Sequence, residues 1–428
     1  MTMLRALFDF AIAAADPFER TRNAFHRPLA ERHDDGRAWI IATGKASPRM
    51  AAAALAAAAD ADIEVAGGLV VVHAPEDIAP PLECVIGDHP VPGTRSLHAA
   101  TRLGALTQAV IPSDHVLLAV SGGTSSLIAA PADGVDGAAL DAAFRTLLGA
   151  GGDVDINVMN AIRRRFLRWG GGRLAAAIAP ARLHQVLLSD VVGDDPSVIG
   201  SGPAVPDPLT ASDVLALIES NGLVSRIDAS LIAFLRDSVS GDVAETPKSS
   251  DTLFAYVDLP IVLGRAMLHD ALRSAARING VPLILHESPL TGEAKMRGRE
   301  LAEWLATDAP QGVHCWTGET TVTLGHDHGR GGRCQELALA AAIALDARGD
   351  RRVTLLSAGT DGRDGPTDAA GAIVSAATAA TLRAKGVDAA ASLARHDSYA
   401  ALDAVDALIK TGATGTNVAD VVIANVGD

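Results

Sequence analysis

The sequence has few aromatic residues, few cysteines and no long apolar run. Aromatic residues make up 3% of its 428 residues, although hydrophobic residues make up 48%. The interior is therefore built from Ala, Val, Leu and Ile rather than from rings. A chain of this length and apolar content has material for two or three domains with sizeable cores. These numbers exclude a disordered chain and a small disulfide scaffold.

The scarcity of cysteine and of apolar runs indicates where the protein works. Cys84, Cys315 and Cys334 are far apart and lack the CxxC spacing of a zinc or redox site. No run reaches 18 uninterrupted apolar residues, the length that a membrane-spanning helix needs. Residues 1–20 lack the basic start and the cleavage site of a signal peptide, and we expect an amphipathic helix there. The sequence thus predicts a soluble protein of the reducing cytoplasm.

The net charge limits the classes of partner. The formal charge is −15 and the sequence pI is about 5.3. Such a chain repels nucleic-acid backbones and anionic lipid headgroups. We therefore expect small-molecule partners and neither nucleic acid nor a membrane, while a homo-oligomer is left open.

Short runs of Val, Ile and Leu alternate with longer Ala- and Leu-rich helical patterns, which is typical of buried parallel strands in an α/β fold. The expected strands are 38–42, 69–72, 116–120, 186–188, 283–285, 320–324, 353–356 and 421–424. A polar stretch between Asp237 and Asp251 predicts a domain boundary near residue 246, which gives domains 1–245 and 246–428. Several strands run into turns rich in Gly, Ser or Asp, where ligands bind in open α/β sheets.

Two of these turns have Gly-rich sequences suited to an anion. In the turn Ser121-Gly122-Gly123-Thr124-Ser125, glycines allow close backbone approach, and amides and hydroxyls can surround a phosphate or carboxylate. An ordinary strand-to-helix turn with a Ser cap is the alternative. In the segment 325–336, Gly331 and Gly332 would let Arg333 approach a polyanion at a helix start. His326 and His328 nearby could bind a metal ion; the alternative is that they are ordinary histidines of a loop.

Charged residues at other strand ends complete the candidate set. Asp361, Asp364 and Asp368 share one loop, and their hard oxygens suit Mg²⁺ and a nucleotide, although an Asp-rich turn would look the same. Lys45, one of few lysines, follows Gly44 at a strand end, where it can reach a transferring phosphoryl group. Asp190 ends another strand, and one of the three acids in the segment from Asp190 to Asp195 could orient an acceptor hydroxyl.

Three familiar signatures are missing. Trp39 and Ala46 occupy positions that a Walker A motif around Gly44 and Lys45 would fill with Gly and Ser or Thr. No Gly-x-Gly-x-x-Gly opens a helix with an acid about twenty residues later, which argues against a dinucleotide site. The singled-out serines lie in no Gly-x-Ser-x-Gly elbow. The residues that remain fit a phosphate chemistry without a Walker motif.

The ordered set of these motifs resembles the glycerate 2-kinase family, the class that contains the MOFRL domain and whose members have often been labelled hydroxypyruvate reductases. The resemblance covers nearly the whole chain and rests on Gly44-Lys45-Ala46, Gly87-Asp88-His89-Pro90-Val91-Pro92, Ser121-Gly122-Gly123, Ser189-Asp190-Val191, Ser201-Gly202-Pro203 with Pro206-Asp207, Gly318-Glu319-Thr320-Thr321-Val322, Gly331-Gly332-Arg333, Gly359-Thr360-Asp361-Gly362 and Thr414-Gly415-Thr416-Asn417-Val418.

The resemblance implies a fold and a reaction. The fold would be a Rossmann-like α/β/α domain followed by a MOFRL-type α/β domain, with a cleft between them. The reaction would be phosphorylation of the 2-hydroxyl of D-glycerate to 2-phosphoglycerate, dependent on ATP and Mg²⁺.

The resemblance also implies roles for individual residues. Lys45 and Arg333 would stabilise the transferring phosphoryl group, and Asp190 and Asp361 would position the hydroxyl and the metal. Contacts to substrate or nucleotide phosphate would come from Ser121, Gly122, Gly123, Thr124, Ser125, Asn160, Arg163, Glu319, Thr360 and Gly362. These roles agree with what phosphoryl transfer needs, which is positioning and neutralisation of charge.

Several residues depart from the family pattern. Gly170 stands where the family has a Lys, Arg165 where it has a His, and Cys334 where it has an Asn. Arg164, Arg165 or Arg168 would have to supply the missing cation from another direction. The alternatives are therefore a kinase for a related hydroxy acid, a hydroxypyruvate reductase, and a catalytically weak binding protein on the same fold.

Overall fold

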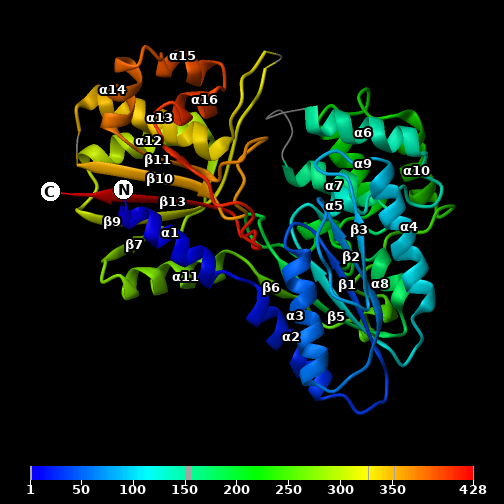
Figure 1. Cartoon of the computed structure of the whole chain (residues 1–428). Helices are drawn as coiled ribbons and strands as arrows, with labels where there is room; N and C mark the ends of the chain where they lie inside the picture. The colour runs from blue at the N-terminus through cyan, green and yellow to red at the C-terminus, as the bar shows by residue number, and fades with distance from the viewer. Residues whose placement is uncertain (1, 150–155, 326, 351, 428) are drawn as a thin grey trace. The chain divides into compact units, whose positions relative to one another are not determined.

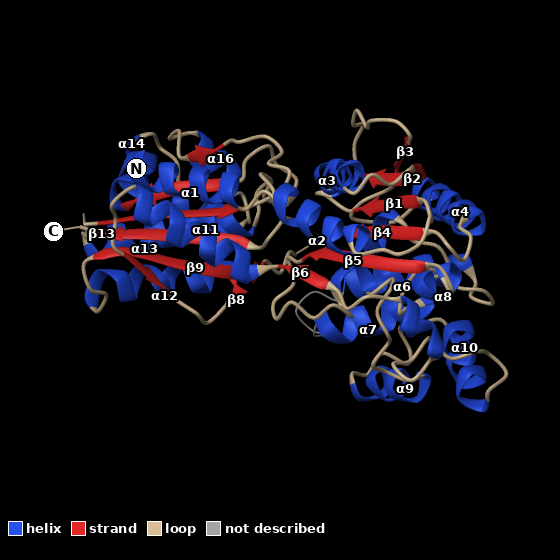
Figure 2. Cartoon of the chain, turned by 90° about the horizontal axis from the view of Figure 1, so that it is seen from below, coloured by secondary structure: helices blue, strands red, loops and turns tan. Residues whose placement is uncertain are grey.

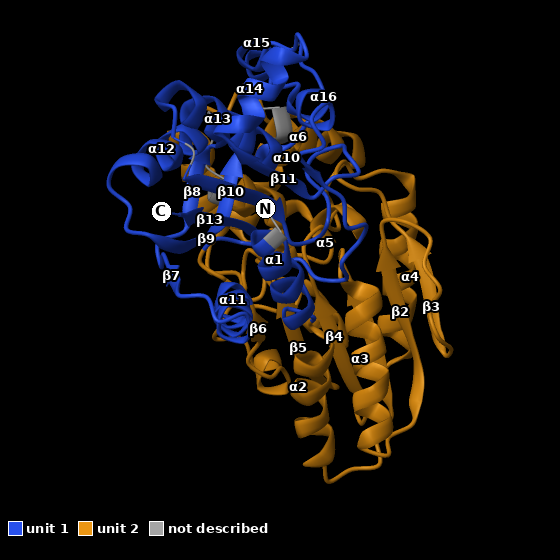
Figure 3. Ribbon diagram, turned by 60° about the vertical axis from the view of Figure 1, so that its left-hand side comes forward, with its two compact units in different colours: residues 1–16, 190–192, 264–428 blue, residues 17–189, 193–263 orange. Residues whose placement is uncertain are grey.

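The computed structural model describes residues 2–149, 156–325, 327–350 and 352–427. It contains two compact units (Figure 3), one of Met1–Asp16, Asp190–Val192 and Gly264–Asp428, called unit 1, and one of Pro17–Ser189 and Gly193–Leu263, called unit 2. This division differs from the expected boundary near residue 246. Residues 246–263 stay with unit 2 because they end in a strand of its sheet, and the first 16 residues belong to unit 1.

Unit 2 is built on a six-stranded parallel sheet in the order β3-β2-β1-β4-β5-β6, which Figure 2 shows side by side. The strands are β1 (Ala38–Thr43), β2 (Val65–Val72), β3 (Leu82–Ile86), β4 (His115–Val120), β5 (Arg182–Leu188) and β6 (Ile261–Leu263). The order reverses between β1 and β4, and ligands of such sheets bind at this switch point, beyond the carboxyl ends of the strands. The Rossmann-like expectation for the first domain is confirmed.

Helices cover both faces of this sheet, which explains why its central strands are apolar throughout. The helices that pack against it are α2 (Phe18–Ala30), α3 (Ser47–Asp60), α4 (Thr94–Ala109) and α8 (Arg173–Ile178). A second core, around Phe144, Phe166 and Phe234, joins further helices of the same unit. These are α6 (Gly137–Gly149), α7 (Ile156–Phe166), α9 (Ala211–Ser220) and α10 (Ala229–Ser240), beside the short α5 (Thr124–Leu127), η2 (Ile199–Ser201) and η3 (Thr252–Tyr256).

Unit 1 is built on a mixed sheet in the order β12-β11-β10-β13-β9-β7, with β8 paired to β9. Its strands are β7 (Leu283–Leu285), β8 (Leu290–Glu293), β9 (Gly312–Thr321), β10 (Val353–Gly359), β11 (Gly371–Ser375), β12 (Leu408–Ile409) and β13 (Asp420–Val426). Strand β13 runs antiparallel to both β9 and β10. The expectation of parallel strands is therefore wrong for this unit. Burial on both faces makes a strand apolar whatever its direction.

Two layers of helices enclose the sheet of unit 1 (Figure 1). Helices α12 (Ala294–Thr307) and α13 (Arg333–Arg348) pack on the sheet and on each other, and α1 (Thr2–Ala14) and α11 (Arg265–Ile278) also pack on it and on each other. Gly298 lets α12 approach α13, because a Cβ there would lie 2.2 Å from the carbonyl oxygen of Leu337. The remaining helices are α14 (Ala376–Ala384), α15 (Ala389–Ala394) and α16 (Ser398–Asp403). Among the described residues, no helix is long and apolar enough to span a membrane.

Most expected strands are present, with shifted ends. Residues 320–324 are an exception, because β9 ends at Thr321 and the chain continues as a loop. The amphipathic helix expected at residues 1–20 is two helices, since α1 ends at Ala14 and α2 begins at Phe18, and the two belong to different units.

A hydrogen-bonded chain of four side chains ties together the amino-terminal ends of β4 and β5. His115 Nε2 lies 2.9 Å from Asp34, His115 Nδ1 lies 3.0 Å from His184 Nε2, and His184 Nδ1 lies 2.6 Å from Asp258. The hydrogen bonds from the histidines lower the pKa of both carboxyls, so the two ends only accept. Both imidazoles are buried, so each depends on the two neighbours in the chain for its hydrogen bonds.

We predict that His184→Gln destabilises unit 2 by about 1–3 kcal/mol, because it removes the middle link and leaves buried partners unsatisfied. Amide hydrogen exchange of β4 and β5 measures the change. His98→Gln, at an exposed position of α4, is the matched control. Equal exchange rates in the two variants would show that the four-residue chain contributes nothing to stability.

Candidate active site

Lys45 lies at the switch point of unit 2, where β1 and β4 end. Its backbone N–H donates to the carbonyl oxygen of Gly122 at 2.9 Å. Gly123 has a φ of 92°, and a Cβ on it would lie 3.8 Å from Lys45 Cγ and 3.0 Å from His89 Cδ2. The structure thus brings Lys45 together with Gly122 and Gly123, as expected. It adds His89, whose motif the sequence contained but to which we had given no role.

The hydroxyls of the Ser121–Ser125 turn do not all face the same way. Ser121 and Thr124 are fully buried and hold the turn to β1: Ser121 Oγ accepts the N–H of Ala46 at 3.1 Å, and Thr124 Oγ1 donates to Thr43 at 3.0 Å. Ser125 is half-buried, and its Oγ lies 2.7 Å from Ser201 Oγ. Among the hydroxyls of this turn that the structure describes, Ser125 is therefore better placed to meet a ligand than Ser121 or Thr124.

The arginines of α7 differ in how they are paired. Arg164 forms an ion pair with Asp207 at 3.0 Å, and Arg165, fully buried, donates to Thr246 at 2.8 Å and pairs with Glu245. Arg168 pairs with Asp133 on the surface. All three of the arginines considered as substitutes for the missing cation are thus paired with carboxylates of unit 2.

Arg163, one turn after Asn160, is different. Its guanidinium lies over the ring of Phe144 at 5.3 Å, and burial lowers its pKa. Its Nε and Nη2 are buried and have no hydrogen-bond partner within the described part of the chain. A desolvated guanidinium with unused donors is suited to an anionic ligand.

Gly170 is fixed by crowding. A Cβ there would lie 2.9 Å from the carbonyl oxygen of Arg164 and 3.4 Å from that of Ser201. Its neighbour Gly171 donates its N–H to Ser201 at 2.9 Å. A side chain at position 170 would therefore press on the backbone at Arg164.

In unit 1, two carboxylates hold the guanidinium of Arg333. Nε and Nη2 donate to the two oxygens of Asp420 at 2.5 and 3.0 Å, and Nη1 lies 2.7 Å from Glu319. Burial disfavours the charge on Arg333, but Asp420 and Glu319 more than offset this and raise its pKa. Asp420 is a residue that the sequence reasoning missed, although it lies two positions after the quoted Thr416–Val418 motif.

The amino-terminal end of α13 is capped by Asp364. Its carboxylate accepts the backbone N–H groups of Cys334 at 3.1 Å and Gln335 at 2.8 Å, and the residue is 3% exposed. At the helix start where Arg333 was expected to approach a polyanion, these two amides are therefore already occupied by a carboxylate of the chain. Burial, with a smaller contribution from Asp420, raises the pKa of Asp364 to about 7.

Asp361, Thr360 and Asp190 lie around the chain that leads into β13. Thr360 Oγ1 donates to Ala419 at 2.7 Å and accepts the N–H of Val418 at 2.9 Å. Asp190 accepts the amide N–H of Asn417 at 2.6 Å, and Asp361 accepts the N–H of Arg363 at 3.0 Å. Gly362 has a φ of 84°, and a Cβ on it would lie 2.0 Å from the carbonyl oxygen of Gly412, so this turn requires glycine.

Asp361 and Asp420 also lie close to one point in unit 1. A Cβ on Gly359 would lie 3.2 Å from Asp361 Oδ1 and 3.4 Å from Asp420 Oδ1. Two acids of this region, Asp420 and Glu319, pair with Arg333, and Asp361 lies near Asp420 across Gly359. Carboxylate oxygens are the donors that Mg²⁺ prefers.

The other metal expectation involved His326 and His328. His326 lies outside the described residues. His328 is exposed, with Nδ1 3.0 Å from the carbonyl oxygen of Gly329. Among the described residues, no group of three or more His, Cys, Asp or Glu side chains could hold a metal ion.

We predict that the stability of unit 1 falls as the pH rises from about 4 to about 7. The folded state keeps a proton on Asp364 in this window, whereas the unfolded chain releases it. The free energy of unfolding therefore falls by up to about 1.4 kcal/mol per pH unit. Urea unfolding followed by the fluorescence of Trp304 and Trp316 measures the slope. Asp364→Asn should flatten it and the exposed Asp308→Asn should not; an unchanged slope in Asp364→Asn would contradict the prediction.

Comparisons with known proteins show the family of this chain. A family described as a domain of unknown function, DUF4147, matches residues 3–236, and the MOFRL family matches residues 312–420. A protein of Agrobacterium vitis with the provisional name hydroxypyruvate reductase is 38% identical over 98% of this chain and 93% of its own length. The D-glycerate 2-kinase of Thermotoga maritima is 36% identical over 90% of each chain.

A solved structure shows the same fold over the whole chain. The crystal structure of glycerate kinase from Thermotoga maritima has a TM-score of 0.80 and 34% identity, and the match covers 99% of both chains. The expected class, two α/β domains, is confirmed. The chain belongs to the glycerate 2-kinase family and is an enzyme of the phosphotransferase class.

Proposed function

We propose that this chain phosphorylates the 2-hydroxyl of D-glycerate to 2-phosphoglycerate, with ATP as the phosphoryl donor and Mg²⁺ as the metal. The observation that carries the proposal is the position of Lys45, beside Gly122 and Gly123 at the switch point of a parallel sheet. A relative named D-glycerate 2-kinase, matched over nine-tenths of both chains, supports the same acceptor.

The residues of unit 2 bind and neutralise anionic groups in this proposal. The ammonium group of Lys45 contacts an oxygen of the transferring phosphoryl group, where a compact, flexible positive charge is suited to a developing negative charge. The backbone of Gly122 and Gly123 and the hydroxyl of Ser125 line the same site. Arg163 and Asn160 bind the substrate carboxylate, because the unused N–H groups of Arg163 match a carboxylate fork.

The residues of unit 1 handle the proton and the metal. The 2-hydroxyl oxygen of glycerate attacks the γ-phosphorus of ATP, and a carboxylate oxygen of Asp190 takes the proton of that hydroxyl. The bond between the γ-phosphorus and the oxygen that bridges it to the β-phosphate breaks, which releases ADP. Arg333 stabilises the transferring group, and Glu319 and the backbone around Thr360 and Gly362 hold the surrounding turns. Asp361 and Asp190 would hold Mg²⁺, which commonly binds one or two carboxylates together with substrate phosphates and neutralises their charge.

The experiment is an ATP- and Mg²⁺-dependent kinase assay with D-glycerate and related hydroxy acids, with the phosphorylated carbon identified by NMR. Phosphate on C2 of glycerate supports the proposal. Turnover of another hydroxy acid alone would move the assignment to that acid. Ligand binding without turnover of any acid would favour a binding protein.

A reductase is the second candidate, favoured by the provisional name of the relative from Agrobacterium vitis and by the strand order of unit 2. That order is shared with dinucleotide-binding sheets. The turn after β1, however, reads Thr43-Gly44-Lys45 in place of Gly-x-Gly-x-x-Gly. Oxidation of NAD(P)H in the presence of hydroxypyruvate would support this candidate, and a lack of NAD(P)H binding would dismiss it.

We predict that Lys45→Ala lowers kcat by about 10²–10³-fold, the usual cost of removing one charge-stabilising donor from a reacting centre. The unfolding midpoint should change little, since the bond that joins Lys45 to Gly122 is made by its backbone N–H, which alanine keeps. Steady-state kinetics and urea unfolding test the two parts. Lys385→Ala, at an exposed position of unit 1, should keep the parent rate; a Lys45→Ala enzyme of normal kcat would refute the role of Lys45.

A further inference from the structure

We infer that Asp420 is a positioning residue that fixes the guanidinium of Arg333 for phosphoryl transfer. The inference rests on the role proposed for Arg333. It assigns a function to a residue outside every motif that the sequence analysis singled out.

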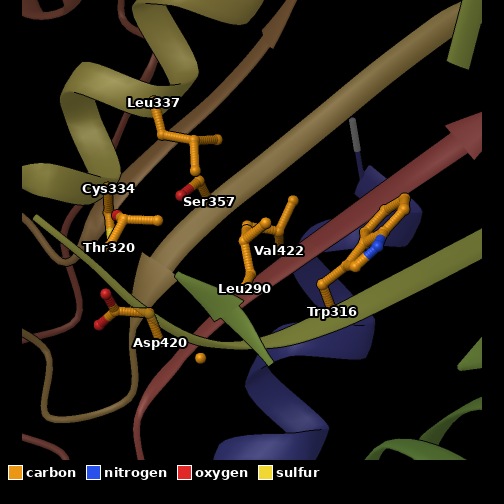
Figure 4. Close-up of a pocket in the computed structure, with 9 residues that line it drawn as sticks. Leu290, Trp316, Thr320, Cys334, Leu337, Ser357, Asp420 and Val422 are labelled. Carbon is orange, nitrogen blue, oxygen red and sulfur yellow. The ribbon is translucent and has the colours of Figure 1, made fainter. Parts of the chain in front are cut away.

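The place of Asp420 in the sheet makes its carboxylate rigid. Asp420 is the first residue of β13 and pairs with Gly318 of β9 on one side and Gly359 of β10 on the other. Both neighbours are glycines, so no side chain from these two positions shields the carboxylate from Arg333. Figure 4 shows Asp420 at the end of a small pocket near Cys334 and Thr320, away from Trp316.

The contact between the two side chains has the geometry of a fork. Asp420 takes the N–H groups of Nε and Nη2, and Glu319 takes one N–H of Nη1. These contacts use three of the five N–H groups of a guanidinium and fix the plane of the group. One further N–H on each terminal nitrogen then has a set direction. A planar donor pair of this kind is suited to two oxygens of a phosphoryl group.

The two carboxylates have unequal roles. The Asp420 side chain is 10% exposed and accepts from two nitrogens of the guanidinium, whereas the Glu319 side chain is 37% exposed and lies against Nη1. A surface contact of one hydrogen bond adds little, because solvent screens it. Asp420 is therefore expected to determine the position of Arg333, and Glu319 to support it.

The surroundings of Asp420 are also buried. Burial raises the pKa of the Cys334 thiol, and Cys334 lines the same pocket as Asp420. Cys334 stands at the position where the resembling family has an Asn.

Loss of the fork should reduce turnover more than binding. Without Asp420 the Arg333 side chain regains rotamer freedom, and a displacement of about 1 Å at a reacting centre can cost 10²-fold in rate. We expect Asp420→Asn to lower kcat by about 10–100-fold with little change in KM. Arg333→Ala should cost at least as much, and the double variant should be no slower than Arg333→Ala, because the two residues act as a unit.

Rescue by guanidinium ion separates positioning from a structural role. In Arg333→Ala, added guanidinium at millimolar concentration should restore kcat by 10-fold or more, because the carboxylate of Asp420 still binds it. In the Arg333→Ala/Asp420→Asn double variant the rescue should be absent. Equal rescue in both variants would overturn the inference.

Asp350→Asn is the matched control. Asp350 pairs with Arg352 at 2.8 Å and its side chain is 8% exposed, so it is an equally buried Asp–Arg pair of the same unit. It should keep the parent kcat; a loss equal to that of Asp420→Asn would attribute both to general destabilisation and overturn the inference. Arg333→Ala with full activity would remove the proposed role of Arg333, and the inference with it. Arg333→Ala inactive beside a fully active Asp420→Asn would overturn the positioning role alone.

Discussion

Unit 1 depends on the ion pair between Arg333, the first residue of α13, and Asp420, the first residue of β13. A cation at the amino-terminal end of a helix is opposed by the positive end of the helix dipole. Asp420 and Glu319 offset this repulsion, and Asp364 binds the amides behind it. Three carboxylates thus balance one cation and one helix end. Burial, with a smaller contribution from Asp420, raises the pKa of Asp364, so a change at Asp420 affects Asp364 as well.

The sheet of unit 2 was predictable because its central strands are buried on both faces. Continuous apolar runs at 38–42 and 116–120 correspond to β1 and β4, and the Gly-rich turns after them mark the switch point. Strands β3 and β6 were missed for physical reasons. The first has two consecutive exposed residues in its middle and lies at the sheet edge, and the second is three residues long. Neither leaves a pattern that composition can distinguish from a loop.

Neither the strand directions in unit 1 nor the contacts of individual side chains could be predicted from the sequence. A run of apolar residues carries no information about strand direction, so it cannot indicate whether β13 is parallel or antiparallel to β10. The turn sequence located Ser121, Thr124 and Ser125, but only the fold determines that the first two bind backbone while Ser125 stays half-buried. Asp420 reaches Arg333 across 87 positions of sequence, and Asp364 reaches Cys334 across 30. No local pattern encodes such pairings.

The residues that differ from the family pattern fit the packing around them. Gly170 lies where a Cβ would come within 2.9 Å of the carbonyl oxygen of Arg164, and each arginine that could have replaced a lysine there is paired with a carboxylate of its own unit. The cation missing at position 170 is therefore not restored by Arg164, Arg165 or Arg168. Buried N–H groups without a partner among the described residues remain on Arg163, and also on Arg164 and Arg165. A guanidinium presents such donors as a rigid planar fork, which favours an anion in one fixed orientation.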